Sequence, residues 1–221
     1  FLLILPSFSF GFTFNLQLIK GWLEAINPIL DKYNAEQNTS VWFHCISALI
    51  PVYFTNTSYH GISVNVANLS ENEIFLLITF FRATFIIGTL WFLRIVSLAG
   101  KSRLFLFWEL SYIFLIIPLI FPHQQKYSYI NLIPCFSYLI YYLVNINSAQ
   151  LQNHRKYKFF LVVPLLAIFL LTSLSADIIW GVEIGKIFQF LKLITGGTIL
   201  LIPLLIYFSP EKVLKKGQSE F

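Results

Sequence analysis

Charged residues are scarce in this sequence. They make up 11% of its 221 residues, whereas hydrophobic residues make up 57%, and the mean hydropathy is +0.73. Soluble domains carry about a quarter charged residues, so this composition is typical of an integral membrane protein. Nucleic-acid binding is not indicated, because the Lys and Arg residues behind the net charge of +5 lie at the ends of apolar runs.

Cysteine and histidine are also rare, which excludes several classes of site. The two cysteines, Cys45 and Cys135, lie in or beside apolar runs without CxxC spacing, so we expect neither a disulfide framework nor a zinc site. Of the four histidines only His44 falls in an apolar run, which argues against a haem held between helices. The sequence also lacks GxSxG, HExxH, a P-loop and a Gly-rich dinucleotide turn. We therefore expect no catalytic residue, metal or cofactor.

Long apolar runs dominate what is present, and they predict an all-α, polytopic transmembrane bundle. A spanning helix needs about 20 apolar residues. Six runs meet this requirement: 1–19, 74–98, 104–122, 127–147, 159–175 and 186–208. A seventh run, 41–54, is short, so we expect it to be re-entrant or interfacial, although a crossing would give seven spans.

The loop charges predict the orientation. Residues 101–103, 154–158 and 211–217 are basic, whereas 71–73 and 176–183 are acidic. Because Lys and Arg collect on the cytoplasmic side, we expect a multi-pass protein whose C-terminus is cytoplasmic.

The chain is expected to form one membrane domain, residues 1–221, with three parts. These are an outer amphipathic and re-entrant cap at 21–73, a five-span core at 74–208 and a basic cytoplasmic tail at 209–221. Three N-x-[ST] triplets fall in the cap, at Asn38, Asn56 and Asn68, and mark possible N-glycosylation if the cap faces a lumen. The sequence has no Met and begins at Phe1, so we expect a processed or trimmed form.

Two charges near the inner boundary suggest a structural ion pair. Arg94 lies roughly 6 Å and Glu109 roughly 8 Å from that boundary on spans joined by a short loop. We therefore expect Arg94 to pair with Glu109, with snorkelling of Arg94 to the headgroups, or contact with a substrate, as alternatives.

Two deeper cations are the candidate site. Arg82 lies roughly 12 Å and Lys192 roughly 9 Å below the outer boundary. Either Asp177 and Glu183 dip in to pair with them, or they line a water-filled cavity that would suit a phosphate, pyrophosphate or carboxylate. A purely structural role for both cations is the third possibility. In the last span, Gly196 and Gly197 predict close helix packing.

These patterns favour a non-catalytic membrane subunit of a transporter or of a larger membrane complex, with the bilayer and other membrane subunits as partners. The alternative is an enzyme acting on a lipid-linked phosphate or pyrophosphate, with Arg82 and Lys192 holding the anion and an outer carboxylate as base. The outer carboxylates are Glu71, Glu73, Asp177 and Glu183. A purely structural membrane subunit is the third hypothesis.

Overall fold

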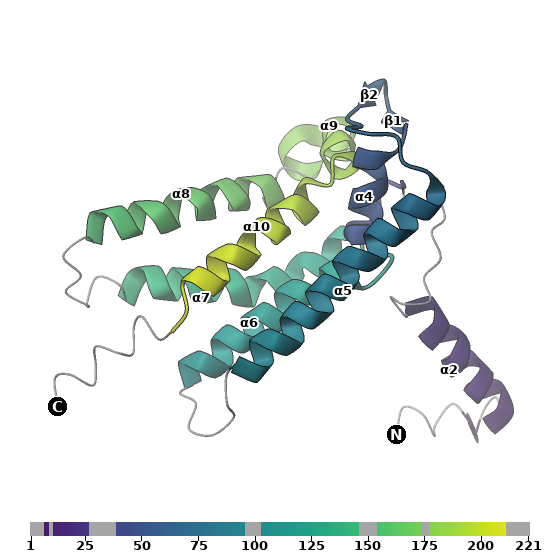
Figure 1. The fold of residues 1–221 in the computed structure, drawn as a ribbon, viewed down its shortest axis with the longest axis horizontal. Helices are drawn as coiled ribbons and strands as arrows, with labels where there is room; N and C mark the ends of the chain where they lie inside the picture. Colours follow the sequence, from purple (N-terminus) through teal and green to yellow (C-terminus); the bar gives the residue numbers. More distant parts are fainter. Residues whose placement is uncertain are drawn as a thin grey trace.

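The chain is mostly helical in a computed structural model. The structure describes residues 7–8, 11–26, 39–95, 103–145, 154–173 and 177–210. Within these ranges, the side chains of residues 25–26, 94–95, 154–158 and 178 are not described. Figure 1 shows long helices packed side by side, with α2 to one side of them. The helices are α2 (Phe12–Ile26), α4 (Ile46–Phe54), α5 (Glu71–Ile95), α6 (Arg103–Ile120), the 3-10 helix η1 (Lys126–Leu132), α7 (Ile133–Asn145), α8 (His154–Ser173), α9 (Asp177–Phe190) and α10 (Leu193–Tyr207). A small antiparallel hairpin, β1 (Ser58–Tyr59) and β2 (Ile62–Ser63), joins α4 to α5.

The number of spans is smaller than the sequence predicts. Among the described residues, α5 and α6 are long and apolar enough to cross a bilayer, and α9 with α10 would add a third crossing if this pair, bent by 59°, counts as one span. The prediction of six or seven spans is therefore not supported.

Helix breaks and short apolar stretches explain part of the difference. Run 127–147 is divided between η1 and α7, and Pro134 occupies the first turn of α7, where its missing N–H is tolerated. With 13 residues, α7 is about 20 Å long, against about 30 Å of hydrocarbon. The apolar part of α8, Phe159–Ser173, is similarly short, and α4 has only 9 residues. Apolar composition marked these runs, but composition does not show where a helix stops.

The predicted boundary between the first span and the cap falls within one helix. Helix α2 runs without interruption through residues 12–26, so it joins the end of the predicted first span to the start of the predicted cap at 21. The division into cap, core and tail otherwise stays a prediction, and residues 211–221 of the tail lie outside the described residues.

The start of α5 is fixed by a local cap. Both the backbone N–H and the hydroxyl of Ser70 donate to Glu73 Oε2, at 2.8 and 2.7 Å. The bond from the Ser70 N–H is the one expected when a Glu three residues into a helix bonds the residue before it. Glu73, one of the outer carboxylates considered as a base, thus caps a helix.

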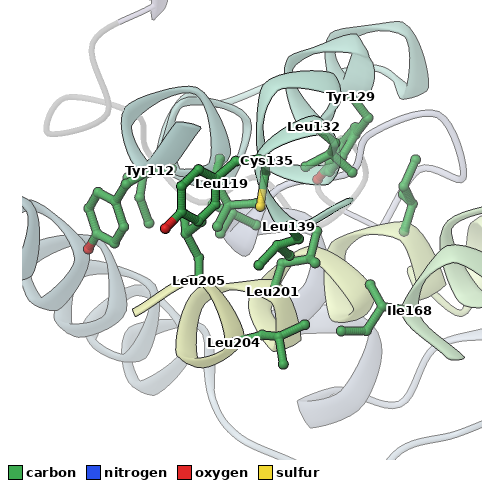
Figure 2. Close-up of a cluster of buried hydrophobic side chains, with 14 of the residues drawn as sticks. Tyr112, Leu119, Tyr129, Leu132, Cys135, Leu139, Ile168, Leu201, Leu204 and Leu205 are labelled. Carbon is green, nitrogen blue, oxygen red and sulfur yellow. The ribbon is translucent and has the colours of Figure 1, made fainter. Parts of the chain in front are cut away.

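Helix α10 is the centre of the packing. It packs most extensively on α8 and also contacts α6, α4 and α7. Figure 2 shows part of the core that these helices enclose, drawn from α6, η1, α7, α8 and α10. The labelled members are Tyr112, Leu119, Tyr129, Leu132, Cys135, Leu139, Ile168, Leu201, Leu204 and Leu205. Both cysteines are buried and free.

Side chains of neighbouring helices complete the end of α10. The last carbonyls of a helix have no partner within it. Trp108 Nε1 donates to Leu205 O at 2.8 Å, and Tyr138 Oη donates to Phe208 O at 2.7 Å. These bonds tie α6 and α7 to the end of α10 and leave its other end, at Lys192, as the place where the polar groups gather.

Candidate functional site

The candidate site lies where α4, η1 and α9 meet the first turn of α10. We call His44, Tyr129, Lys192 and Thr195 the Lys192 cluster. All four residues are buried. Their positions come from the loop before α4, from η1, from the break between α9 and α10, and from α10 itself.

Lys192 occupies the break between α9 and α10. Its backbone is left-handed, with φ of 53°, a conformation uncommon outside glycine. The side chain is 0% exposed, and its Nζ donates to Ser40 O at 2.6 Å and to Phe43 O at 2.8 Å. The lysine therefore links the segment before α4 to the start of α10, which explains how a basic residue is accommodated in an apolar run.

Both backbone polar groups of His44 are hydrogen-bonded. Its N–H donates to Gln124 O at 2.6 Å, and its carbonyl accepts from the hydroxyl of Tyr129. That hydroxyl also lies 3.3 Å from Thr195 Oγ1. The loop before α4, η1 and α10 are thus connected through one phenol, whose pKa is raised by its burial.

The imidazole of His44 is less well satisfied. The side chain is 0% exposed, and neither ring nitrogen has a hydrogen-bond partner among the described residues. Burial, followed by the charges of Lys192 and Lys126, lowers the pKa of His44 to about 3. The ring is therefore neutral at physiological pH.

Asp177 pairs with a residue other than the predicted partners. Its Oδ2 lies 2.8 Å from Lys126 Nζ, and its Oδ1 accepts from Gln189 Nε2 at 2.9 Å. The carboxylate of Asp177, the first residue of α9, lies close to Gly185 of the same helix, because a Cβ at position 185 would lie 2.6 Å from Asp177 Oδ1.

Glu183 is also away from the predicted cations. It lies 3.8 Å from His60 Nε2 on the β hairpin and 3.6 Å from Lys186 Nζ, and it is largely exposed. The structure therefore brings neither Asp177 nor Glu183 to Lys192, whose amine is bonded to backbone carbonyls instead. The contacts of Asp177 and Glu183 are with other basic groups of the same end of the molecule.

Arg82 and Glu109 are both buried inside the bundle, at 5% and 6% exposed. Each makes polar or electrostatic contacts, so neither is a free charge. The side chain of Arg94 lies outside the described residues, so the Arg94–Glu109 pair stays a prediction. Among the sequons, Asn56 and Asn68 are exposed and Asn38 lies outside the described residues.

The two glycines of the last span have different surroundings. A Cβ on Gly197 would lie 3.0 Å from Thr172 Cγ2 of α8, so this glycine permits close helix packing. A Cβ on Gly196 would meet nothing within 4 Å. Gly196 lines an apolar cavity of about 450 Å³ between α4, α5, α8 and α10, whose lining includes Lys192 and Tyr53.

The sequence analysis missed the carbonyls of Ser40 and Phe43 and the side chains of Gln189 and Lys126. The carbonyls of Ser40 and Phe43 give no signal in a sequence, since every residue has one. Gln189 is a neutral side chain in an apolar run. Lys126 could have been found, because the loop charges place it on the same side of the membrane as Asp177.

The arrangement builds a connecting network of hydrogen bonds and ion pairs. Among the described residues no group of three or more His, Cys, Asp or Glu side chains could hold a metal ion. Comparison with protein-family models, curated proteins and solved structures finds no match to this chain. The geometry of the Lys192 cluster and its surroundings is therefore the basis of the functional argument.

Proposed function

We propose that the chain is a non-catalytic integral membrane subunit of a transporter or of a larger membrane complex. The observation that carries this proposal is the position of Lys192 Nζ, which donates to two carbonyls of its own chain. A substrate-binding cation in a water-filled cavity would keep its donors for the substrate. The buried cation instead holds the fold together.

Exposed apolar side chains on α5 support a role within the bilayer and beside other subunits. Five large examples lie along this helix: Leu76, Phe80, Ile87, Leu90 and Trp91. Acyl chains or apolar helices of partner subunits would cover such a surface.

Contacts between three segments support placing them on one side of the membrane. The positive-inside rule assigns residues 55–73, 123–126 and 176–185 to the outer side. Lys126 lies against Asp177, and His60 lies near Glu183, so these three loops meet at one end of the molecule. The basic loop at 101–103 and the C-terminus would then be cytoplasmic.

The experiment compares Lys192→Gln with Lys20→Gln in protein purified in mild detergent. Lys20 is an exposed lysine on α2. Lys192→Gln should lower the melting temperature, because burying unpaired carbonyls costs about 1–3 kcal/mol, whereas Lys20→Gln should leave it unchanged. The wild-type protein should also co-purify with a membrane protein at fixed stoichiometry. A Lys192→Gln protein that melts like wild type but loses binding of inorganic pyrophosphate would refute the proposal.

One observation favours a second function, an enzyme acting on a lipid-linked phosphate. The apolar cavity beside Lys192 has the polarity that a lipid chain requires. Product formation from a lipid-linked phosphate by the purified chain, lost in Arg82→Gln, would support this second function over the first.

A further inference from the structure

The apolar cavity beside Lys192 continues along α10. A second cavity, of about 470 Å³, lies between α8 and α10 and is lined by Phe160, Pro203 and Tyr207 among others. Leu171 and Leu200 line both cavities. The two spaces are therefore neighbours, and together they follow α10 from Lys192 to Tyr207.

The two cavities need an apolar occupant. Each is within the range of about 300–1,000 Å³ that is typical of ligand pockets. Leu, Ile and Phe side chains dominate the lining, so water would find too few hydrogen-bond partners to stay. An empty space costs free energy in proportion to its volume. In a bilayer, the apolar molecule present at the highest concentration is the lipid itself.

The dimensions fit one lipid chain. Helix α10 has 15 residues and is about 22 Å long, enough to follow a chain through one leaflet of about 15 Å. The polar contacts of this region gather at the Lys192 end of α10, where the lysine donates to Ser40 O and Phe43 O. A polar headgroup near that end and an apolar tail along α10 would match this distribution, with no contact between the headgroup and the buried amine of Lys192.

We propose that the two cavities form one site that binds an acyl chain of a bilayer phospholipid, with the headgroup at the Lys192 end of α10. Gly196 belongs to this site, because its missing side chain leaves open the space beside Leu200. The proposal requires α10 to lie in the membrane, and it holds for either of the functions above.

The test fills the cavity from Gly196. In Gly196→Leu the new side chain occupies the space that the lipid would take, and Gly196→Ala is the smaller step of the same series. Both changes favour a helix over glycine, so both proteins should fold. Gly21→Leu is the matched control, because it adds the same side chain in open space on α2. Native mass spectrometry in mild detergent measures how much of each protein carries one phospholipid.

Wild type and Gly21→Leu should carry one phospholipid per chain. Its occupancy should fall about tenfold in Gly196→Leu and less in Gly196→Ala, because the free volume shrinks in that order. Adding phosphatidylglycerol to delipidated protein should raise the melting temperature of wild type and not that of Gly196→Leu. Equal occupancy in all four proteins would overturn the proposal. A polyprenyl phosphate or a sterol in place of the phospholipid would also overturn it.

Discussion

At the scale of single residues, Lys192 shows how a basic group can lie in an apolar run. The two carbonyls that it binds belong to Ser40 and Phe43, about 150 residues earlier in the chain. A buried donor is stable when such partners are present and costly when they are absent. A buried cation therefore indicates a partner, and the partner need not be a carboxylate or a substrate.

His44 leads to a prediction on pH. Its pKa is about 3 in the folded protein because of burial and of the nearby Lys192 and Lys126, and the usual value is about 6.5. Below that value the unfolded chain binds a proton at His44 while the folded chain does not. The contribution of His44 to the free energy of unfolding is therefore complete above about pH 6.5 and is lost as the pH decreases. The loss should reach about 1.4 kcal/mol per pH unit.

Melting temperatures between pH 7 and pH 5 measure this effect. His44→Gln should flatten the dependence, because it removes the titrating group. His60→Gln, on the exposed β hairpin, is the control and should retain the wild-type dependence. The same pH dependence in His44→Gln as in wild type would rule out His44 as its source.

At the scale of elements, α9 depends on a glycine to hold its own first residue. Gly185 leaves room for the carboxylate of Asp177, which reaches both Lys126 and Gln189. This carboxylate ties the start of α9 to η1 through Lys126, which is 51 positions from Asp177 in the sequence. We therefore expect the position of α9 to depend on that contact.

Gly185→Ala should therefore destabilise the protein. Its Cβ would lie 2.6 Å from Asp177 Oδ1 and 3.3 Å from Asp177 Cα, so the carboxylate must move. The loss of its bonds should exceed the gain in helix propensity, for a net cost of about 1–2 kcal/mol. Thermal unfolding in detergent measures the change.

Gly88→Ala is the matched control on α5. Its Cβ would lie 3.8 Å from the Tyr112 hydroxyl, an ordinary contact, so stability should stay the same or rise by about 0.5–1 kcal/mol. Should Gly185→Ala be as stable as Gly88→Ala, the contact of Asp177 would have no role in holding α9.

At the scale of the whole molecule, the polar contacts gather at one end. The Lys192 cluster, the Lys126–Asp177 pair and the β hairpin with Glu183 all belong to it. The last turn of α5 and the first turn of α6 lie at the opposite end of that helix pair (Figure 1). If α5 and α6 cross the bilayer, these two ends face opposite sides.

Cysteine labelling tests this arrangement. Tyr127 is exposed at the end that carries the polar contacts, and Arg103 is exposed at the start of α6. With an impermeant thiol reagent on sealed cells or vesicles, Tyr127→Cys should react from outside and Arg103→Cys only after permeabilisation. Cys45 and Cys135 are buried and give the background, which the wild-type protein measures. Reaction of both variants from the same side would contradict a crossing by α6.

By itself, the sequence determined an apolar composition typical of membrane proteins, the mostly helical class and the identity of the buried basic residues. These follow from hydropathy and charge, which are properties of each residue and its close neighbours. Runs 74–98 and 104–122 became α5 and α6, because their apolar stretches contain no early helix break. Only the tertiary structure decided that the other described runs form shorter or bent helices. It also decided the contacts of Lys192 with Ser40 and Phe43 and of Asp177 with Lys126. In the same way it placed Gly196 at a cavity and Gly197 against α8. The physical reason is that backbone carbonyls, helix breaks and empty space depend on residues far apart in the chain, which no local pattern records.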